Sequence, residues 1–247
     1  RVVGPSLAGV VIVAVGVAWT VAVAAALQIL ALMWTARLPD EASERTARGG
    51  SLRSNLMVGV RVVGNDPFLV GLILLATVST VLVMPYINLM PVFARDELGL
   101  GATGLGVLMA CTGLGSVAGA LLVARWRGLA TIPGIQISSS LAFTVLVLVF
   151  ALTPITAVAG LLLFLAGIVS AAYMAVNQTV LQLQVADEVR GRVLSIYLLT
   201  WGMLPLGQLP IGALADAIGA PLATAAASAV AMAFILLLVV RFPSLRR

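Results

Sequence analysis

Long runs of apolar residues without a charge constrain this chain more than any other feature of its sequence. No charged residue occurs from Val2 to Ala36, and only Arg125 and Arg127 interrupt the uncharged stretch between Glu97 and Asp187. Of the 247 residues, 62% are hydrophobic and 9% are charged, whereas a soluble domain carries about 25% charged residues. Because a membrane-spanning helix needs about 20 apolar residues, the sequence predicts an all-α, polytopic membrane protein.

The apolar runs divide into about eight predicted membrane spans, since a span and its loop take roughly 30 residues. The predicted spans are Val2–Gly16, Ala18–Ala36, Phe68–Phe93, Gly104–Ala124, Pro133–Leu152, Val158–Gln184, Val193–Ala215 and Pro221–Val240. The first of them is short, and we therefore expect its helix to begin before Arg1.

The longest polar segment, Arg37–Asp66, separates the second predicted span from the third. Its first part has the composition of a flexible linker. Its second part predicts a short amphipathic helix, with apolar residues at helical spacing: Leu52, Leu56, Val60 and Val63. Such a helix can lie on the inner leaflet or pack on the protein's own cytoplasmic face.

The distribution of arginine predicts the orientation of the chain. If the segment 37–66 is cytoplasmic, twelve of the 14 basic residues fall on that side and only Arg95 falls on the opposite side. Cytoplasmic loops of membrane proteins are enriched in such residues. We therefore expect a multi-pass protein with its C-terminus in the cytoplasm.

The absence of histidine and the presence of a single cysteine, Cys111, exclude several classes of function. A disulfide scaffold, a His/Cys metal site and a Ser/Cys–His catalytic pair all need residues that the chain lacks. The basic residues lie in short loops between apolar runs, which is typical of membrane proteins and not of nucleic-acid binding. We expect neither an enzyme nor a cofactor nor a metal site.

The last predicted helix pair repeats a glycine spacing of the first. Spacings of five and seven residues separate the glycines in both sets, which are Gly4, Gly9 and Gly16, and Gly207, Gly212 and Gly219. Each pair then ends in an arginine two residues before a proline, at Arg37 and Arg241. As a true repeat, the two copies would be about six helices apart. The chain would then be built of six-helix halves, with four further helices before Arg1.

Three stretches resemble the major facilitator superfamily. Residues 4–9 are similar to the antiporter motif of its fifth helix, with Ala8 in place of one glycine. Residues 91–99 are similar to the end of the seventh helix in a branch with enterobactin-exporter-like and macrolide-efflux-like proteins. Residues 177–193 are similar to that branch's tenth helix and following loop, with Ala186 where proline is usual. The resemblance covers the chain as helices five to twelve.

This resemblance implies a major facilitator fold that lacks its first four helices. Residues 1–36 would be the last two helices of the N-terminal half, 37–66 the cytoplasmic central linker, and 67–247 the C-terminal six-helix half. It implies a protein of the bacterial inner membrane, monomeric when full length. Such a protein would export a small drug- or siderophore-like molecule by alternating access and proton antiport.

Polar residues on three predicted spans are candidates for a substrate cavity, since each group shares one helical face. They are Thr77, Thr80, Met84 and Asn88, then Ser170, Tyr173 and Asn177, then Tyr197, Trp201 and Gln208. In the resembled fold these helices line the central cavity, which we expect to be mostly apolar with a few hydrogen-bonding groups. Hydrogen bonds between helices are the alternative role of such residues.

Other motifs are candidates for a gate and for helix packing. The resemblance implies that Gly4, Pro5 and Gly9 seal the cavity against leak, although a kinked packing site is also possible. A charged cluster follows the sixth predicted span and could be an inner-gate ion-pair cluster or a set of solvated topology charges. Its members are Asp187, Glu188, Arg190 and Arg192. Gly115 and Gly119 predict a close approach of two helices.

No acidic residue lies within a predicted span away from its ends; Asp216 is at an outer helix end. Since intramembrane acids are the usual proton carriers, a coupling carboxylate is expected in the missing helices. The alternative function is a membrane scaffold or accessory protein that transports nothing. The sequence leaves open the identity of the substrate, the coupling ion and the oligomeric state.

Overall fold

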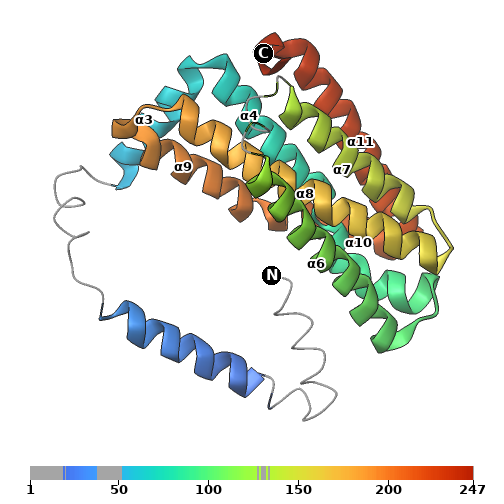
Figure 1. The fold of residues 1–247 in the computed structure, drawn as a ribbon. Helices are drawn as coiled ribbons and strands as arrows, with labels where there is room; N and C mark the ends of the chain where they lie inside the picture. Colours follow the sequence, from blue (N-terminus) through green and yellow to red (C-terminus); the bar gives the residue numbers. More distant parts are fainter. Residues whose placement is uncertain are drawn as a thin grey trace.

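The computed structural model of the protein describes residues 19, 21–37, 52–126, 128, 132 and 134–246. Regular structure within these residues is helical, and no strand occurs among them (Figure 1). The elements are α3 (Leu52–Asn65), α4 (Pro67–Val78), η1 (Ser79–Val83), α5 (Tyr86–Val92), η2 (Phe93–Glu97), α6 (Gly101–Arg125), α7 (Ile135–Ala151), α8 (Thr156–Gln184), α9 (Asp187–Gly202), α10 (Leu204–Ile218), α11 (Ala220–Arg241) and η4 (Pro243–Arg246).

Five helical stretches are long and apolar enough to cross a membrane. They are Pro67–Glu97, Gly101–Arg125, Thr156–Gln184, Asp187–Ile218 and Ala220–Arg241. The shorter apolar helices Val21–Thr35 and Ile135–Ala151 coincide with two further predicted spans. The predicted span Val2–Gly16 lies outside the described residues. The prediction of an all-α, polytopic membrane protein is therefore confirmed.

The helices α4 to α11 form one bundle, and α3 lies across one end of it beside α9 (Figure 1). The C-terminus lies at this same end, which we call the α3 end. The helix Val21–Thr35 is drawn apart from the bundle, and its side chains are exposed. Two buried apolar clusters follow each other along the bundle axis, one at the α3 end around Leu72 and Leu181, and one at the other end around Phe143 and Phe150.

The span Pro67–Glu97 is interrupted near its middle. A π-helical turn, η1, places the Met84 amide 3.0 Å from the carbonyl of Ser79, and Pro85 follows directly. Because proline has no N–H, it leaves the Val81 carbonyl without its usual partner four residues on. Gly207 of α10 covers this carbonyl so closely that a Cβ would lie 1.7 Å from the oxygen. A neighbouring helix thus packs directly on the break and keeps this carbonyl inside the protein, where irregular backbone within a membrane is tolerated.

The pair α6 and α8 packs at backbone contact. A Cβ on Gly115 would lie 2.0 Å from the carbonyl oxygen of Phe164, and one on Gly119 would lie 2.2 Å from that of Ile168. From the other side, a Cβ on Gly167 would lie 2.2 Å from the carbonyl oxygen of Thr112. From Gly115 to Gly119 the contact on α8 moves forward from Phe164 to Ile168. The two helices therefore run parallel. The predicted close approach at Gly115 and Gly119 is confirmed.

The helix α3 packs on the protein, one of the two locations that its amphipathic pattern allowed. Gly59 lies against the backbone of α9, where a Cβ would come within 2.8 Å of the Arg192 carbonyl oxygen. Val63 is buried on the same face, as predicted, but Val60 is 57% exposed. Val60 thus lies off the part of the apolar stripe that packs on α9. The reason is that Gly59, which has no side chain, permits the closest approach and centres the contact on itself.

Candidate functional site

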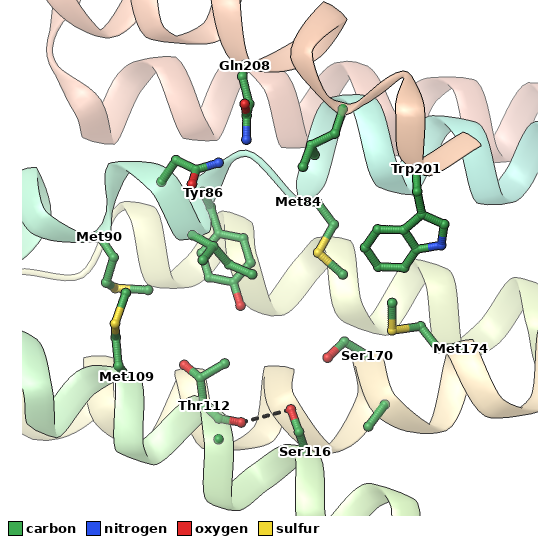
Figure 2. A pocket seen from close by; sticks show the side chains of 15 residues that line it. Met84, Tyr86, Met90, Met109, Thr112, Ser116, Ser170, Met174, Trp201 and Gln208 are labelled. Carbon is green, nitrogen blue, oxygen red and sulfur yellow. Dashed lines mark hydrogen bonds between the residues drawn. The ribbon is translucent and has the colours of Figure 1, made fainter. Parts of the chain in front are cut away.

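A cavity of about 420 Å³ opens between α5, α6, α8 and the junction of α9 with α10 (Figure 2). Two helix breaks border it. The first is the one at Pro85, directly after Met84, and the second is at Met203, where α9 ends and α10 begins, two residues after Trp201. Its lining residues are Met84, Tyr86, Ile87, Asn88, Met90, Met109, Thr112, Gly113, Ser116, Ser170, Ala171, Met174, Trp201, Leu204 and Gln208. The lining thus comes from segments that are far apart in the sequence.

Three hydroxyl groups on the cavity wall are already engaged with their own helices. Thr112 donates to the carbonyl of Leu108 at 3.2 Å, and Ser116 donates to the carbonyl of Thr112 at 3.0 Å (Figure 2). Ser170 donates to the carbonyl of Gly167 at 3.1 Å. Since a hydroxyl carries one proton, these groups can accept a hydrogen bond from a ligand but have no proton left to give.

Methionine dominates the apolar part of the wall. Four methionines line the cavity, namely Met84, Met90, Met109 and Met174, and the sulfurs of Met90 and Met109 point toward each other in Figure 2. Methionine is unbranched and polarisable, so that it adapts to ligands of different shape and makes favourable contacts with aromatic rings. None of the described residues that line the cavity is charged. The wall therefore suits a lipophilic molecule and offers an ion no partner.

A buried polar cluster lies one helical turn closer to the α3 end than the cavity. Ser79 and Ser140 share a hydrogen bond of 2.9 Å between η1 and α7. On α8, the Asn177 amide nitrogen donates to the Tyr173 hydroxyl at 3.4 Å. The Tyr173 side chain also interacts with Ser79, and Tyr197 of α9 interacts with Asn177. The cluster joins four helices and lies between the cavity and the α3 end.

One atom of this cluster lacks a partner. The amide oxygen of Asn177 is buried without a hydrogen bond among the described residues. A buried water bonded to such an atom is the common solution in folded proteins, and the neighbouring tyrosine hydroxyls offer the water further partners. No group of three or more His, Cys, Asp or Glu side chains that could hold a metal ion occurs in the described part of the chain.

The corner between α8 and α9 is held by Arg190. Its guanidinium pairs with Asp187 in the first turn of α9 and donates to the carbonyls of Gln182 at 3.1 Å and Val185 at 3.5 Å. The last carbonyls of a helix lack partners within it, and a cation at this end is favourable. Arg190 thus fastens the end of α8 to the start of α9.

Comparison with known proteins places this architecture in a family. The family model described as transmembrane secretion effector, within the major facilitator superfamily, matches residues 1–247. The chain belongs to this family of major facilitator transporters. No curated protein and no solved structure matches the chain. The family assignment identifies a multi-pass membrane transport protein and confirms the superfamily that the sequence motifs indicated.

In this transporter, five of the ten candidate cavity residues line the cavity. They are Met84, Asn88, Ser170, Trp201 and Gln208. The first two belong to the broken span, and the last two lie on either side of the second break. The helix breaks therefore bring these three predicted groups together.

The other five candidates lie outside the cavity wall. Thr77 donates to the carbonyl of Ile73 at 2.9 Å within α4, and Thr80 is buried in η1. Tyr173, Asn177 and Tyr197 form part of the buried polar cluster. Their positions correspond to the alternative role of polar residues in membrane helices, which is to join one helix to another.

Sequence reasoning missed the contribution of α6 to the cavity. Met109, Thr112, Gly113 and Ser116 all line it. Met109, Thr112 and Ser116 follow each other at spacings of three and four, which places them on one helical face. This pattern was visible, but the neighbouring glycines indicated a packing helix alone. The helix does both, with Gly115 and Gly119 turned toward α8.

The structure describes the four predicted gate residues but not the three residues of the predicted antiporter motif. Arg190 and Asp187 pair within one corner, whereas Glu188 and Arg192 have no ion pair with another described residue. The residues Gly4, Pro5 and Gly9 lie outside the described part of the chain.

Proposed function

We propose that this transporter exports small, lipophilic, drug-like molecules without net charge by alternating access. The observation that carries the proposal is the cavity of about 420 Å³ with thioethers and aromatic rings on its wall and no charge. A siderophore-like anion, the other substrate class that the sequence allowed, would need a cationic partner, because an unpaired charge is costly to bury. The described residues of the cavity wall supply none.

The composition of the wall supports a range of substrates rather than one. Flexible methionine surfaces can repack around different ligands, which is the basis of promiscuous binding elsewhere. Asn88 and Gln208 add amide groups that can donate or accept hydrogen bonds at the same wall. The polar cluster around Asn177 joins helices between the cavity and the α3 end, which is where alternating access would need the bundle to close.

Proton antiport is the coupling that we propose. The acids of the described residues lie at helix ends or in loops, away from the cavity: Asp66, Asp96, Glu97, Asp187, Glu188 and Asp216. A proton carrier for this mechanism must therefore lie outside the described cavity wall. The proposal of export and that of proton coupling are separate and need separate tests.

The experiment compares accumulation of neutral lipophilic dyes, macrolides and siderophores in cells with and without the full-length protein. We expect lower accumulation of the neutral compounds and unchanged accumulation of anionic siderophores. A protonophore should abolish the difference. Efflux that survives collapse of the proton gradient would refute antiport and leave export intact, whereas equal accumulation of every compound would favour the scaffold alternative.

A pair of matched substitutions ties the effect to the cavity. Ala171→Leu places a larger side chain on the cavity wall of α8 and should reduce efflux of neutral dyes. Ala157→Leu makes the same change on the same helix, in an exposed apolar groove near its start, and should leave efflux unchanged. Equal efflux by both variants at equal abundance would contradict a role of this cavity in transport.

A further inference from the structure

Tyr86 is the one hydroxyl on the described cavity wall that has no hydrogen-bond partner. Its side chain is buried, with 2% exposure, and it begins α5 directly after the break at Pro85. Figure 2 shows its hydroxyl pointing into the cavity, toward the side of Thr112 and Ser170. No hydrogen bond joins this hydroxyl to another described residue, whereas Thr112, Ser116 and Ser170 all donate to their own helices.

The ring of Tyr86 is fixed by aromatic contacts. Phe143 and Phe150 meet it edge to face, with ring centroids 6.1 and 6.2 Å away and an interplanar angle of 67° in both cases. Phe150 in turn lies 4.9 Å from the Phe93 ring. These contacts need the ring and not the oxygen, so a phenylalanine would pack equally well. The hydroxyl is therefore explained by what enters the cavity and not by the packing of the bundle.

The other donors on the wall are less well placed to select a ligand. Asn88 is exposed, and Trp201 and Gln208, which also carry N–H donors, are half-buried, so none of the three is enclosed as fully as Tyr86. A donor that is buried and held rigid loses little freedom when it binds, and it discriminates strongly because leaving it unpaired is unfavourable. Tyr86 is the donor on this wall that combines burial with rigidity.

We infer that the Tyr86 hydroxyl donates a hydrogen bond to the substrate and selects lipophilic molecules that carry an accessible carbonyl or ether oxygen. The inference rests on the proposed export function and names the substrate class within it. The bond forms between the phenol O–H and the acceptor oxygen. Hydrocarbons of similar size can enter the same apolar wall but leave this donor unpaired.

The test compares two fluorescent probes in the full-length transporter and in Tyr86→Phe. Nile red is a neutral dye with a conjugated carbonyl, and diphenylhexatriene is a hydrocarbon without an acceptor. Wild-type protein should export Nile red in preference to diphenylhexatriene. In Tyr86→Phe we expect the KM for Nile red to rise about threefold to tenfold, the effect of one hydrogen bond. Its maximal rate for Nile red should not change, and the efflux of diphenylhexatriene should rise, since no donor is then left unpaired beside the hydrocarbon.

The outcomes separate this inference from the proposed function. Export of Nile red by Tyr86→Phe with an unchanged KM would overturn the inference while the export function stands. A loss of membrane abundance in Tyr86→Phe would also overturn it, since the hydroxyl would then serve folding. Failure of the wild-type protein to export either probe would count against the proposed function, and the inference would fail with it.

Discussion

Polar residues inside the bundle either line the cavity or join helices, and residues of the two kinds are only one helical turn apart. Ser170 and Trp201 face the cavity, whereas Tyr173 and Tyr197, three or four residues away, are buried among neighbouring helices. Within a membrane a polar group without a partner is costly. Each side chain in the buried set is therefore expected to stabilise the bundle through its partner, and not to bind substrate.

The Ser79–Ser140 pair offers a direct test of this role. Ser79→Ala leaves the buried Ser140 hydroxyl without its side-chain partner, and Ser140→Ala removes one of the two side-chain partners of Ser79. Each should lower the free energy of unfolding by about 1 kcal/mol. The double variant should lose less stability than the sum of the losses in the two single variants, since neither hydroxyl of the pair then remains. Thermal unfolding in detergent measures this cycle. Ser138→Ala, on the same helix but exposed and bonded to its own backbone, is the control and should change stability little.

At the scale of helices, glycine determines which pairs come into backbone contact. Gly115 and Gly119 bring α6 against α8, Gly207 brings α10 against η1, and Gly59 brings α3 against α9. Two of these contacts bear directly on the cavity, because α6 and η1 lie next to its wall. The distance between helices at these points decides how wide the cavity can be.

Gly115→Ala should separate α6 from α8, because the added methyl group would lie 2.0 Å from the Phe164 carbonyl oxygen, a backbone atom that cannot move aside alone. We expect a loss of roughly 1–3 kcal/mol in stability, typical of overpacking, together with reduced transport. Thermal unfolding and membrane abundance measure the change.

Gly106→Ala is the control for this substitution. It makes the same change on the same helix, where the new methyl group meets nothing within 4 Å, and it should be neutral or slightly stabilising because alanine favours helix. Equal stability of the two variants would contradict backbone contact between α6 and α8.

At the scale of the whole molecule, charge separates the two ends of the bundle. Arg125, Arg190, Arg241 and Arg246 lie at helix ends on the side of α3, and Arg95 lies at the opposite end beside Asp96, 2.6 Å away. This asymmetry supports our proposal that the α3 end and the C-terminus are cytoplasmic.

The orientation can be tested with the intact protein. A protease-sensitive tag after Arg247 should resist protease added outside spheroplasts of a bacterial host and be cleaved once the membrane is opened. The same tag inserted after Gly99, in the loop beside Arg95, should be cleaved from outside. Cleavage of the C-terminal tag in sealed spheroplasts would reverse the proposed orientation.

The arginines of the α8–α9 corner allow a structural role to be separated from a gate. Arg190→Gln removes the contacts to Asp187 and to the end of α8, so we expect both abundance and transport to fall. Arg192 has no ion pair among the described residues and is free to pair across an inner gate when the transporter changes state. Arg192→Gln should therefore slow transport severalfold at unchanged abundance, as an efflux assay with immunoblotting would show. Normal transport by Arg192→Gln would exclude its role in a gate.

Much of the architecture followed from local sequence. Apolar runs located the spans to within a few residues, as the predicted Val158–Gln184 and the observed Thr156–Gln184 illustrate. The two interruptions that border the cavity were less evident. Pro205 follows the junction of α9 with α10, and proline is a sequence signal for a kink. The π-helical turn before Pro85 has no signal in hydropathy, because the span that contains it is apolar throughout.

The sequence by itself determined that this protein is helical, lies in a membrane and belongs to a transporter superfamily, because the length of apolar runs, the distribution of arginine and short motifs are all local properties. Only the tertiary structure decided which polar residues meet. Ser170, Tyr173 and Asn177 share one broad helical face, yet Ser170 opens to the cavity while the other two are enclosed by η1 and α9. The reason is that a helical face is wide enough to touch two neighbours, and the neighbours come from distant parts of the chain.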